Sequence, residues 1–178
     1  QRTVGQSDCA TPIPGLTLFR RETPARPVIC FVEPSIVLVV QGEKQLMVGG
    51  EAYLYDTNRF LITSLDIPAN SQVITANLQK PCLGLTLKLD LAIIAELIAQ
   101  SGLSLPVEHS DDRGSRSVGI GTVTPALIDT FKRLLDLLNE PSVIPVLAPL
   151  IAREIHFRLL QSEQAARLRQ IASVGSQG

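Results

Sequence analysis

The chain has 178 residues, a formal net charge of -1 and an isoelectric point near 6.2, so it fits one domain, with or without a helical appendage, that buries a substantial core. Aromatic residues make up 4% of it, tryptophan is absent and Lys and Arg do not cluster. Nucleic-acid readout by this chain alone is therefore excluded, because it depends on clustered cations and on stacking platforms.

Membrane and disulfide chemistry have little support in the sequence. The longest apolar run is far short of a membrane span and no basic-then-apolar signal segment opens the chain, so we expect a cytoplasmic protein with no membrane partner. Cys9, Cys30 and Cys82 cannot all pair with one another and show no CxxC spacing, which makes a disulfide framework or a zinc site improbable. Buried inert thiols are the simplest interpretation, and redox or electrophile sensing at Cys30 or Cys82 is the alternative.

The first half of the chain alternates short apolar segments with turn residues. Strands are predicted, in chain order, at residues 16–19, 36–40, 45–48, 51–55, 60–63, 72–76 and 83–89. Residues 41–44 are expected to form a tight turn, and Gly49-Gly50 is a two-residue hairpin signal. The pattern resembles a small double-stranded β-barrel of the cupin type.

The period changes after residue 89. Asp90 can cap a helix that ends at Gly102, and residues 109–122 are expected to form an exposed loop. Thr124-Pro125 is a strong helix start. Further helices are expected from about residue 147 to 160, and from a cap at Ser162 through Ile171.

The helix after Thr124 has one apolar face and one charged face. Phe131, Leu134 and Leu138 lie on the apolar face, and Leu137 lies roughly 60° beyond it. Because this widens the apolar surface past what one supporting sheet covers, we expect these four residues to meet the same helix of a second subunit. In the following helix, Glu154 and Arg158 have two open interpretations, a local helix pair or a partly buried polar junction that fixes how this helix meets another domain or subunit.

No histidine occurs between residues 29 and 89, although cupin enzymes usually hold a metal with barrel histidines and a glutamate. His109 and His156 lie outside this run, and neither has the partners of a catalytic triad or a metal site nearby in the sequence. The sequence therefore predicts no catalytic residue, no metal and no cofactor. A barrel without metal ligands is expected to hold a small molecule or to scaffold an assembly.

Tyr53 and Tyr55 are the best candidates for ligand contacts, because residues two apart on a strand share a face. If they point inward, their rings wall a pocket; if outward, they cover a helix or meet solvent. Weaker candidates are Gln41, Thr63, Cys30 and Cys82, which lie on or at the ends of predicted strands.

An ordered series of segments then carries a family resemblance: QGEK, GGEAYLYD, FLITSLDIP, PCLGLTLKLD, RLLDLL, LAPLIAREIHFRLL and ARLRQIASVGSQ. From about residue 13 to its end, the chain resembles the N-terminal domain of AraC-type transcriptional regulators. The resemblance implies a cupin-like barrel followed by helices that regulate, and often dimerise, a bacterial transcription factor. Such proteins normally continue into a DNA-binding part with two helix-turn-helix motifs, which this chain is expected to lack.

We therefore expect a mainly β plus α fold, with a cupin-like double-stranded β-barrel over residues 1–89 followed by C-terminal helices over 90–172. Residues 173–178 are expected to begin a linker to the missing DNA-binding domain. The predicted function is small-molecule effector sensing and homodimerisation in an AraC-type regulator, which would contact DNA only through the missing part. The alternatives are a ligand-free structural dimerisation domain and a cupin-type enzyme.

Overall fold

Short segments rich in Val, Ile and Leu build one sheet, because such segments favour extended backbone and the turn residues between them reverse the chain. The structure is a computed structural model that describes residues 8–64, 67–101 and 117–175. Its strands are β1 (Asp8–Ala10), β2 (Leu16–Arg21), β3 (Val28–Val32), β4 (Ser35–Gln41), β5 (Glu43–Val48), β6 (Glu51–Asp56), β7 (Arg59–Thr63), β8 (Ile67–Thr75), β9 (Cys82–Lys88) and β10 (Val118–Thr122). Its helices are α1 (Leu91–Ser101), α2 (Pro125–Asp136), α3 (Ile144–Leu160) and α4 (Ala165–Gly175), with 3₁₀ turns η1 (Leu137–Asn139) and η2 (Pro141–Val143).

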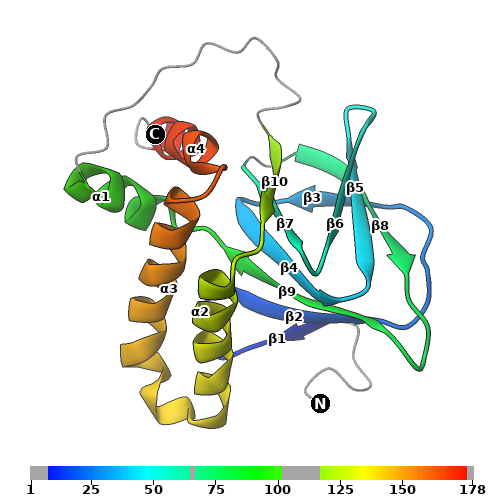
Figure 1. The fold of residues 1–178 in the computed structure, drawn as a ribbon, viewed down its shortest axis with the longest axis horizontal. Coiled ribbons are helices and arrows are strands. Elements are labelled where there is room, and N and C mark those ends of the chain that lie inside the picture. The colour runs from blue at the N-terminus through cyan, green and yellow to red at the C-terminus, as the bar shows by residue number, and fades with distance from the viewer. Residues whose placement is uncertain (1–7, 65–66, 102–116, 176–178) are drawn as a thin grey trace.

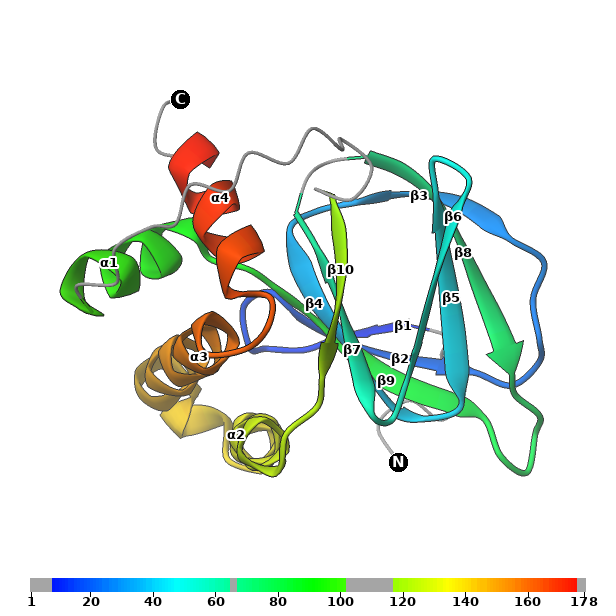
Figure 2. The ribbon, with the colours of Figure 1, turned by 45° about the horizontal axis from the view of Figure 1, so that its top comes forward.

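The sheet is antiparallel and curls into a half-barrel, with the helices gathered at one side (Figure 1). Its strand order is β1-β2-β9-β4-β7-β6-β5-β8-β3, and β10 adds beside β7. β6 and β7 share only the pair Asp56 and Arg59, so the sheet bends sharply there. Figure 2 shows the result: a layer of β3, β8, β5 and β6 faces a layer of β2, β9, β4 and β7 across an interior. The predicted fold class, a cupin-like barrel followed by helices, is confirmed.

Two apolar cores follow from this arrangement. One lies between the outer face of the β2–β9–β4–β7 layer and the helices, and the other fills much of the barrel interior. Strand alternation produces both: along β4, Ile36 and Leu38 face the helices while Val37 and Val39 face the interior. The run is buried on both sides, as its β-branched composition predicts.

Side-chain caps and glycines at turns define where several elements begin and end. The side chain of Asp90 accepts hydrogen bonds from the backbone of Ala92 and Ile93, and Thr124 accepts one from Leu127, so both predicted N-caps are confirmed. Gly49 and Gly50 both have positive φ, at 57° and 86°, which is the backbone of the predicted two-residue hairpin.

The structure corrects several boundaries. The turn predicted over residues 41–44 reduces to Gly42, whose φ of 90° turns the chain from one layer to the other, so Glu43 and Lys44 already belong to β5. Residues 118–122, predicted to be loop, form β10 because they pair with β7, and residues 102–116 lie outside the described ranges. The linker predicted over 173–178 is helical to Gly175, and its last three residues are not described.

The described residues contain no group of three or more His, Cys, Asp and Glu residues arranged to hold a metal ion. No single helix in those ranges is long and apolar enough to cross a membrane; only a bent pair, Pro125–Asn139 with Pro141–Leu160, meets the length and composition criteria together.

Candidate functional site

The interior of the barrel is the candidate site, because it combines apolar walls with a few polar groups. The register aligns Val28 of β3, Ser71 of β8, Leu46 of β5 and Tyr53 of β6 in one row across the layer. Leu46 is buried in the interior core, whereas Val28, on the same face by strand alternation, stays 62% exposed. The interior core therefore does not extend to the start of the edge strand β3.

Lys44 lies in the adjacent row, between Tyr55 of β6 and Val73 of β8. Its Nζ is 4.4 Å from the centre of the Phe19 ring and 5.9 Å from that of Tyr55, within the range of cation–π attraction. Burial lowers the pKa of Lys44, and the nearby guanidinium of Arg21 lowers it further. Among the described residues, the ammonium has no carboxylate partner and no hydrogen-bond acceptor.

Arg21 is the second cation of this region, and its guanidinium lies 5.9 Å from the centre of the same Phe19 ring. Its Nη2 donates to both carboxylate oxygens of Asp8, at 2.9 and 3.2 Å. Asp8 is therefore already engaged, and among the described residues Lys44 has no carboxylate within ion-pair distance, although the charge of Asp8 acts on it.

Tyr53 and Tyr55 both face the interior, which decides between the two orientations left open by the sequence. Tyr55 is 1% exposed, and burial raises the pKa of its hydroxyl although a hydrogen bond with Ser71 acts in the opposite direction. Tyr53 packs partly against the same core and donates to Oε2 of Glu51 at 2.6 Å. The interior thus holds the buried side chain of Tyr55, whose ring lies beside the ammonium of Lys44.

The weaker candidates have structural partners. Gln41 donates from Nε2 to the backbone oxygen of Pro81, and Thr63 donates from its hydroxyl to the backbone oxygen of Glu33, both at 2.6 Å. Cys30 and Cys82 face the interior; Cys82 is fully buried, and burial raises the pKa of its thiol, which disfavours the reactive thiolate. Of these four weaker candidates, only Cys30 and Cys82 act electrostatically on the pKa of Lys44 and so lie near it.

Lys44 is the residue that sequence reasoning missed, because it was assigned to a turn. One signal could have found it: Lys44 and Leu46 are two residues apart, so if β5 began at residue 43 they would share the interior face.

Strand β10 is hydrogen-bonded to the turn between α3 and α4. Gln164 donates from Nε2 to the backbone oxygen of Ile120 at 2.8 Å, and Oε1 of Glu163 accepts from the backbone and hydroxyl of Thr122 at 2.6 and 2.8 Å. A Cβ on Gly119 would lie 2.0 Å from Oε1 of Gln164, so a larger residue there would push this side chain out of its present position. These hydrogen bonds therefore connect the barrel wall to the turn that precedes α4.

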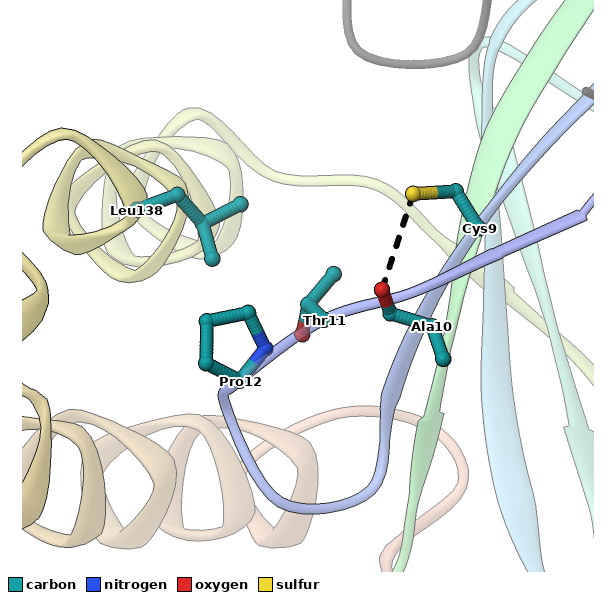
Figure 3. A pocket seen from close by; sticks show the side chains of 5 residues that line it. All are labelled: Cys9, Ala10, Thr11, Pro12 and Leu138. Carbon is teal, nitrogen blue, oxygen red and sulfur yellow. Dashed lines mark hydrogen bonds between the residues drawn. The ribbon is translucent and has the colours of Figure 1, made fainter.

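A separate pocket of about 290 Å³ lies between the N-terminal segment and the helices (Figure 3). It is lined by Cys9, Ala10, Thr11, Pro12 and Leu138. The Cys9 thiol donates to the backbone oxygen of Ala10 at 3.5 Å, and the lining offers no charged group. This pocket is outside the barrel interior and shares no residue with the ligand site predicted from the sequence.

The four residues predicted to form a dimer interface are buried within the chain. Phe131, Leu134, Leu137 and Leu138 are at most 9% exposed and belong to the core between sheet and helices. The α-helical wheel does not describe the position of Leu137, because α2 ends at Asp136 and the 3₁₀ turn η1 begins at Leu137. This change of helix type turns the Leu137 side chain inward. None of the four offers surface to a second subunit in this structure.

Comparison with known proteins decides the family. The model of the AraC-type transcriptional regulator N-terminus matches residues 12–167. This chain belongs to the AraC-type family. No curated protein matches this AraC-type chain by sequence at a significant level.

The fold of the AraC-type chain is similar to solved regulator structures at low sequence identity. ToxT from Vibrio cholerae O395, bound to (E)-4-(8-methylnaphthalen-1-yl)but-3-enoic acid, matches with a TM-score of 0.58 at 8% identity, over 91% of this chain and 58% of ToxT. The AraC-like transcriptional activator CuxR matches with a TM-score of 0.50 at 12% identity, over 84% and 52% of the two chains. ToxT from strain SCE256, bound to an unsaturated fatty acid, matches with a TM-score of 0.50 at 7% identity, over 77% and 51%. The chain spans about half the length of these structures.

Proposed function

We propose that this chain is the effector-sensing part of an AraC-type transcription factor, and that a small molecule binds inside the barrel. The observation that carries the proposal is the ammonium of Lys44, which lies 4.4 Å from the centre of the Phe19 ring on the interior side of the barrel and has no carboxylate within ion-pair distance among the described residues. A purely structural domain would be expected to fill its interior with close-packed aliphatic side chains instead. Two similar ToxT structures contain a bound organic acid, which supports the binding of a ligand in a fold of this kind.

The proposed response to the effector is a shift between two packings of β10 against α4. β10 forms part of the barrel wall, and Glu163 and Gln164 attach it to the α3–α4 turn. A ligand that prefers one position of β10 would then move the start of α4 and whatever follows that helix. DNA binding belongs to the longer protein in this proposal, since the chain spans about half of its relatives.

Effector binding is tested by calorimetric titration of the full-length protein with a broad set of small molecules, with operator DNA affinity measured in parallel. A matched pair of variants locates the site: Ser71→Trp places a large ring in the interior row, and Asn70→Trp places the same ring on the exposed outer face of β8. We expect Ser71→Trp to abolish binding and Asn70→Trp to preserve it, with circular dichroism confirming that both fold. Absence of any ligand, or of coupling between ligand and DNA, would contradict the proposal.

We also propose that two copies associate through α3. Val146, Leu150 and Phe157 are 67, 61 and 40% exposed, and at about 100° per residue they lie within roughly 40° of one another on the helix. Spacings of four and seven residues suit the seam between two packed helices, so a second copy of α3 is a self-complementary partner.

Light scattering after gel filtration tests the α3 interface. Leu150→Glu is expected to give a monomer, whereas Ile128→Glu, which changes an exposed residue of α2 outside this stripe, is expected to leave the dimer intact. A monomeric unmodified protein, or a dimer that tolerates Leu150→Glu, would remove α3 from the proposal.

A further inference from the structure

We propose that the effector is a small carboxylic acid with an apolar body, and that Nζ of Lys44 binds its carboxylate. The inference rests on the proposed effector-sensing function and names the ligand class of that same site.

The first step of the argument is the charge balance of the barrel interior. Two cations, Lys44 and Arg21, approach the ring of Phe19, and the only carboxylate within the described residues that contributes to Lys44 electrostatically is Asp8. Asp8 is bound by Arg21, so among the described residues the ammonium of Lys44 has no carboxylate of its own at ion-pair distance. A buried charge without a partner is unfavourable, and a bound anion would compensate it.

The second step is that Lys44 is already partly desolvated in the free protein, because its ammonium lies over the ring of Phe19 on the interior side of the barrel. An ion pair formed there loses little further hydration on the protein side, which favours binding over an equivalent pair at the surface. The aromatic rings on which the ammonium lies fix its position without neutralising it. Lys44 is thus preorganised for an anion.

The third step concerns which anion fits. Tyr55 lies directly opposite Lys44 and Ser71 lies in the adjacent row, and their side chains are hydrogen-bonded to each other. Leu46 and Val73 provide apolar surface on the same face. One cation beside apolar surface matches a monoanion with an apolar body, whereas a phosphate dianion requires more positive charge and more donors.

A covalent alternative uses the same lysine. A desolvated amine can condense with an aldehyde to form an imine with loss of water. This chemistry requires no carboxylate on the ligand, so it can be distinguished experimentally from ion pairing.

The test uses benzoate and octanoate as probes, each compared with its uncharged amide, in calorimetric titrations of the full-length protein. We expect the acids to bind at least about tenfold more tightly than the amides, and Lys44→Met to weaken the acids by about the same factor. Lys88→Met is the matched control, since Lys88 is an exposed lysine of the same barrel, paired with Glu33. It should leave both affinities unchanged, and Lys44→Arg should retain the preference for acids.

Three results would overturn the carboxylate proposal. The first is acid binding that Lys44→Met leaves unchanged. The second is tight binding of the amides, or of other neutral effectors, with equal affinity in the unmodified protein and in Lys44→Met. This result would support the effector function and contradict the proposed ligand class. The third is a mass increase after treatment with benzaldehyde and borohydride that is absent in Lys44→Met, which would show imine formation. If no compound from the broad set binds, the effector function itself fails.

Discussion

Nε2 of His156 accepts a hydrogen bond of 2.9 Å from the backbone N–H of Asp90, a residue 66 positions earlier in the chain. Since a backbone N–H can only donate, Nε2 must be unprotonated, and Nδ1 carries the proton toward the backbone oxygen of Ala152 at 2.6 Å. The neutral ring therefore joins α3 to the point where β9 leaves the barrel and α1 begins.

This pairing predicts a loss of stability at mildly acidic pH. Burial lowers the pKa of His156, opposed by its bond to Ala152 and by the Asp90 carboxylate, so the unfolded chain takes up a proton more readily than the folded one. The free energy of unfolding should be constant above about pH 6.5 and fall as the pH drops through 6.5 toward the lower folded value, by at most about 1.4 kcal/mol per pH unit from this group. Urea titrations at pH 7.5 and 5.5 measure it. His156→Gln should remove the difference and His109→Gln should keep it; an equal slope in all three proteins would contradict the assignment.

A second pH dependence is expected at more acidic values. Glu154 is bound by Arg133 and Arg158, which lower its pKa to about 2, and by Thr130, which is fully buried between α2 and α3. Its contribution is present above about pH 4.5 and is lost as the pH falls toward 2. Because the carboxylate is 30% exposed, solvent screening limits the contribution to about 1 kcal/mol or less.

The variant Glu154→Gln isolates this contribution. It should lower the free energy of unfolding at pH 7 and flatten the profile between pH 5 and 2, whereas Asp129→Asn, on the exposed side of α2, should do neither. Identical acid profiles for Glu154→Gln and the unmodified protein would show that the network does not stabilise the α2–α3 pair.

Lys44→Met should stabilise the ligand-free protein. The substitution keeps most of the side-chain volume while it removes a desolvated charge without an anionic partner, and such replacements are neutral or stabilising. Loss of the contacts with Phe19 and Tyr55 costs about 0.5–1 kcal/mol in the opposite direction, so we expect a net gain of about 1 kcal/mol. Differential scanning calorimetry in the absence of ligand checks the sign, and a melting temperature several degrees lower would indicate that Lys44 has a structural role.

Gly84→Ala is expected to disrupt the barrel. A Cβ at this position of β9 would lie 2.2 Å from the backbone oxygen of Leu38 and 2.4 Å from the ring of Phe19, so β4 and β2 must both move. We expect a loss of at least about 3 kcal/mol in urea unfolding. Gly49→Asn, at a hairpin position with open space and a φ that asparagine tolerates, is the control and should cost little.

Gln164→Ala tests the link between the barrel and α4. The change removes the hydrogen bond to Ile120 while the buried contacts of Leu168 and Ile171 keep the helix in place. Under the proposed function, an effector should slow hydrogen exchange in α4 of the unmodified protein and have a smaller effect on α4 in this variant. Ser173→Ala at the far end of α4 serves as the control. Equal protection of α4 in both variants would exclude the β10 route.

The sequence by itself determined the features that depend on neighbouring residues. The Gly49-Gly50 hairpin, the caps at Asp90 and Thr124 and most strand centres were predicted correctly, because turn and cap chemistry is decided within about four residues. The ordered segments also indicated the AraC-type family. Strand β10 escaped prediction, since its glycine-rich sequence is extended only through its pairing with β7.

Only the tertiary structure decided which side chains meet. Lys44 enters the barrel because β5 begins at Glu43, directly after the turn at Gly42, and a shift of one residue would have turned Lys44 to the other face. Leu137 and Leu138 are buried by the 3₁₀ turn and α3 rather than by a second subunit. Glu154 and Arg158 form the local helix pair, and they also bind Thr130 of α2 in the same chain, a contact that the sequence did not predict. In each case the outcome depends on contacts between residues far apart in the chain, which local patterns do not specify.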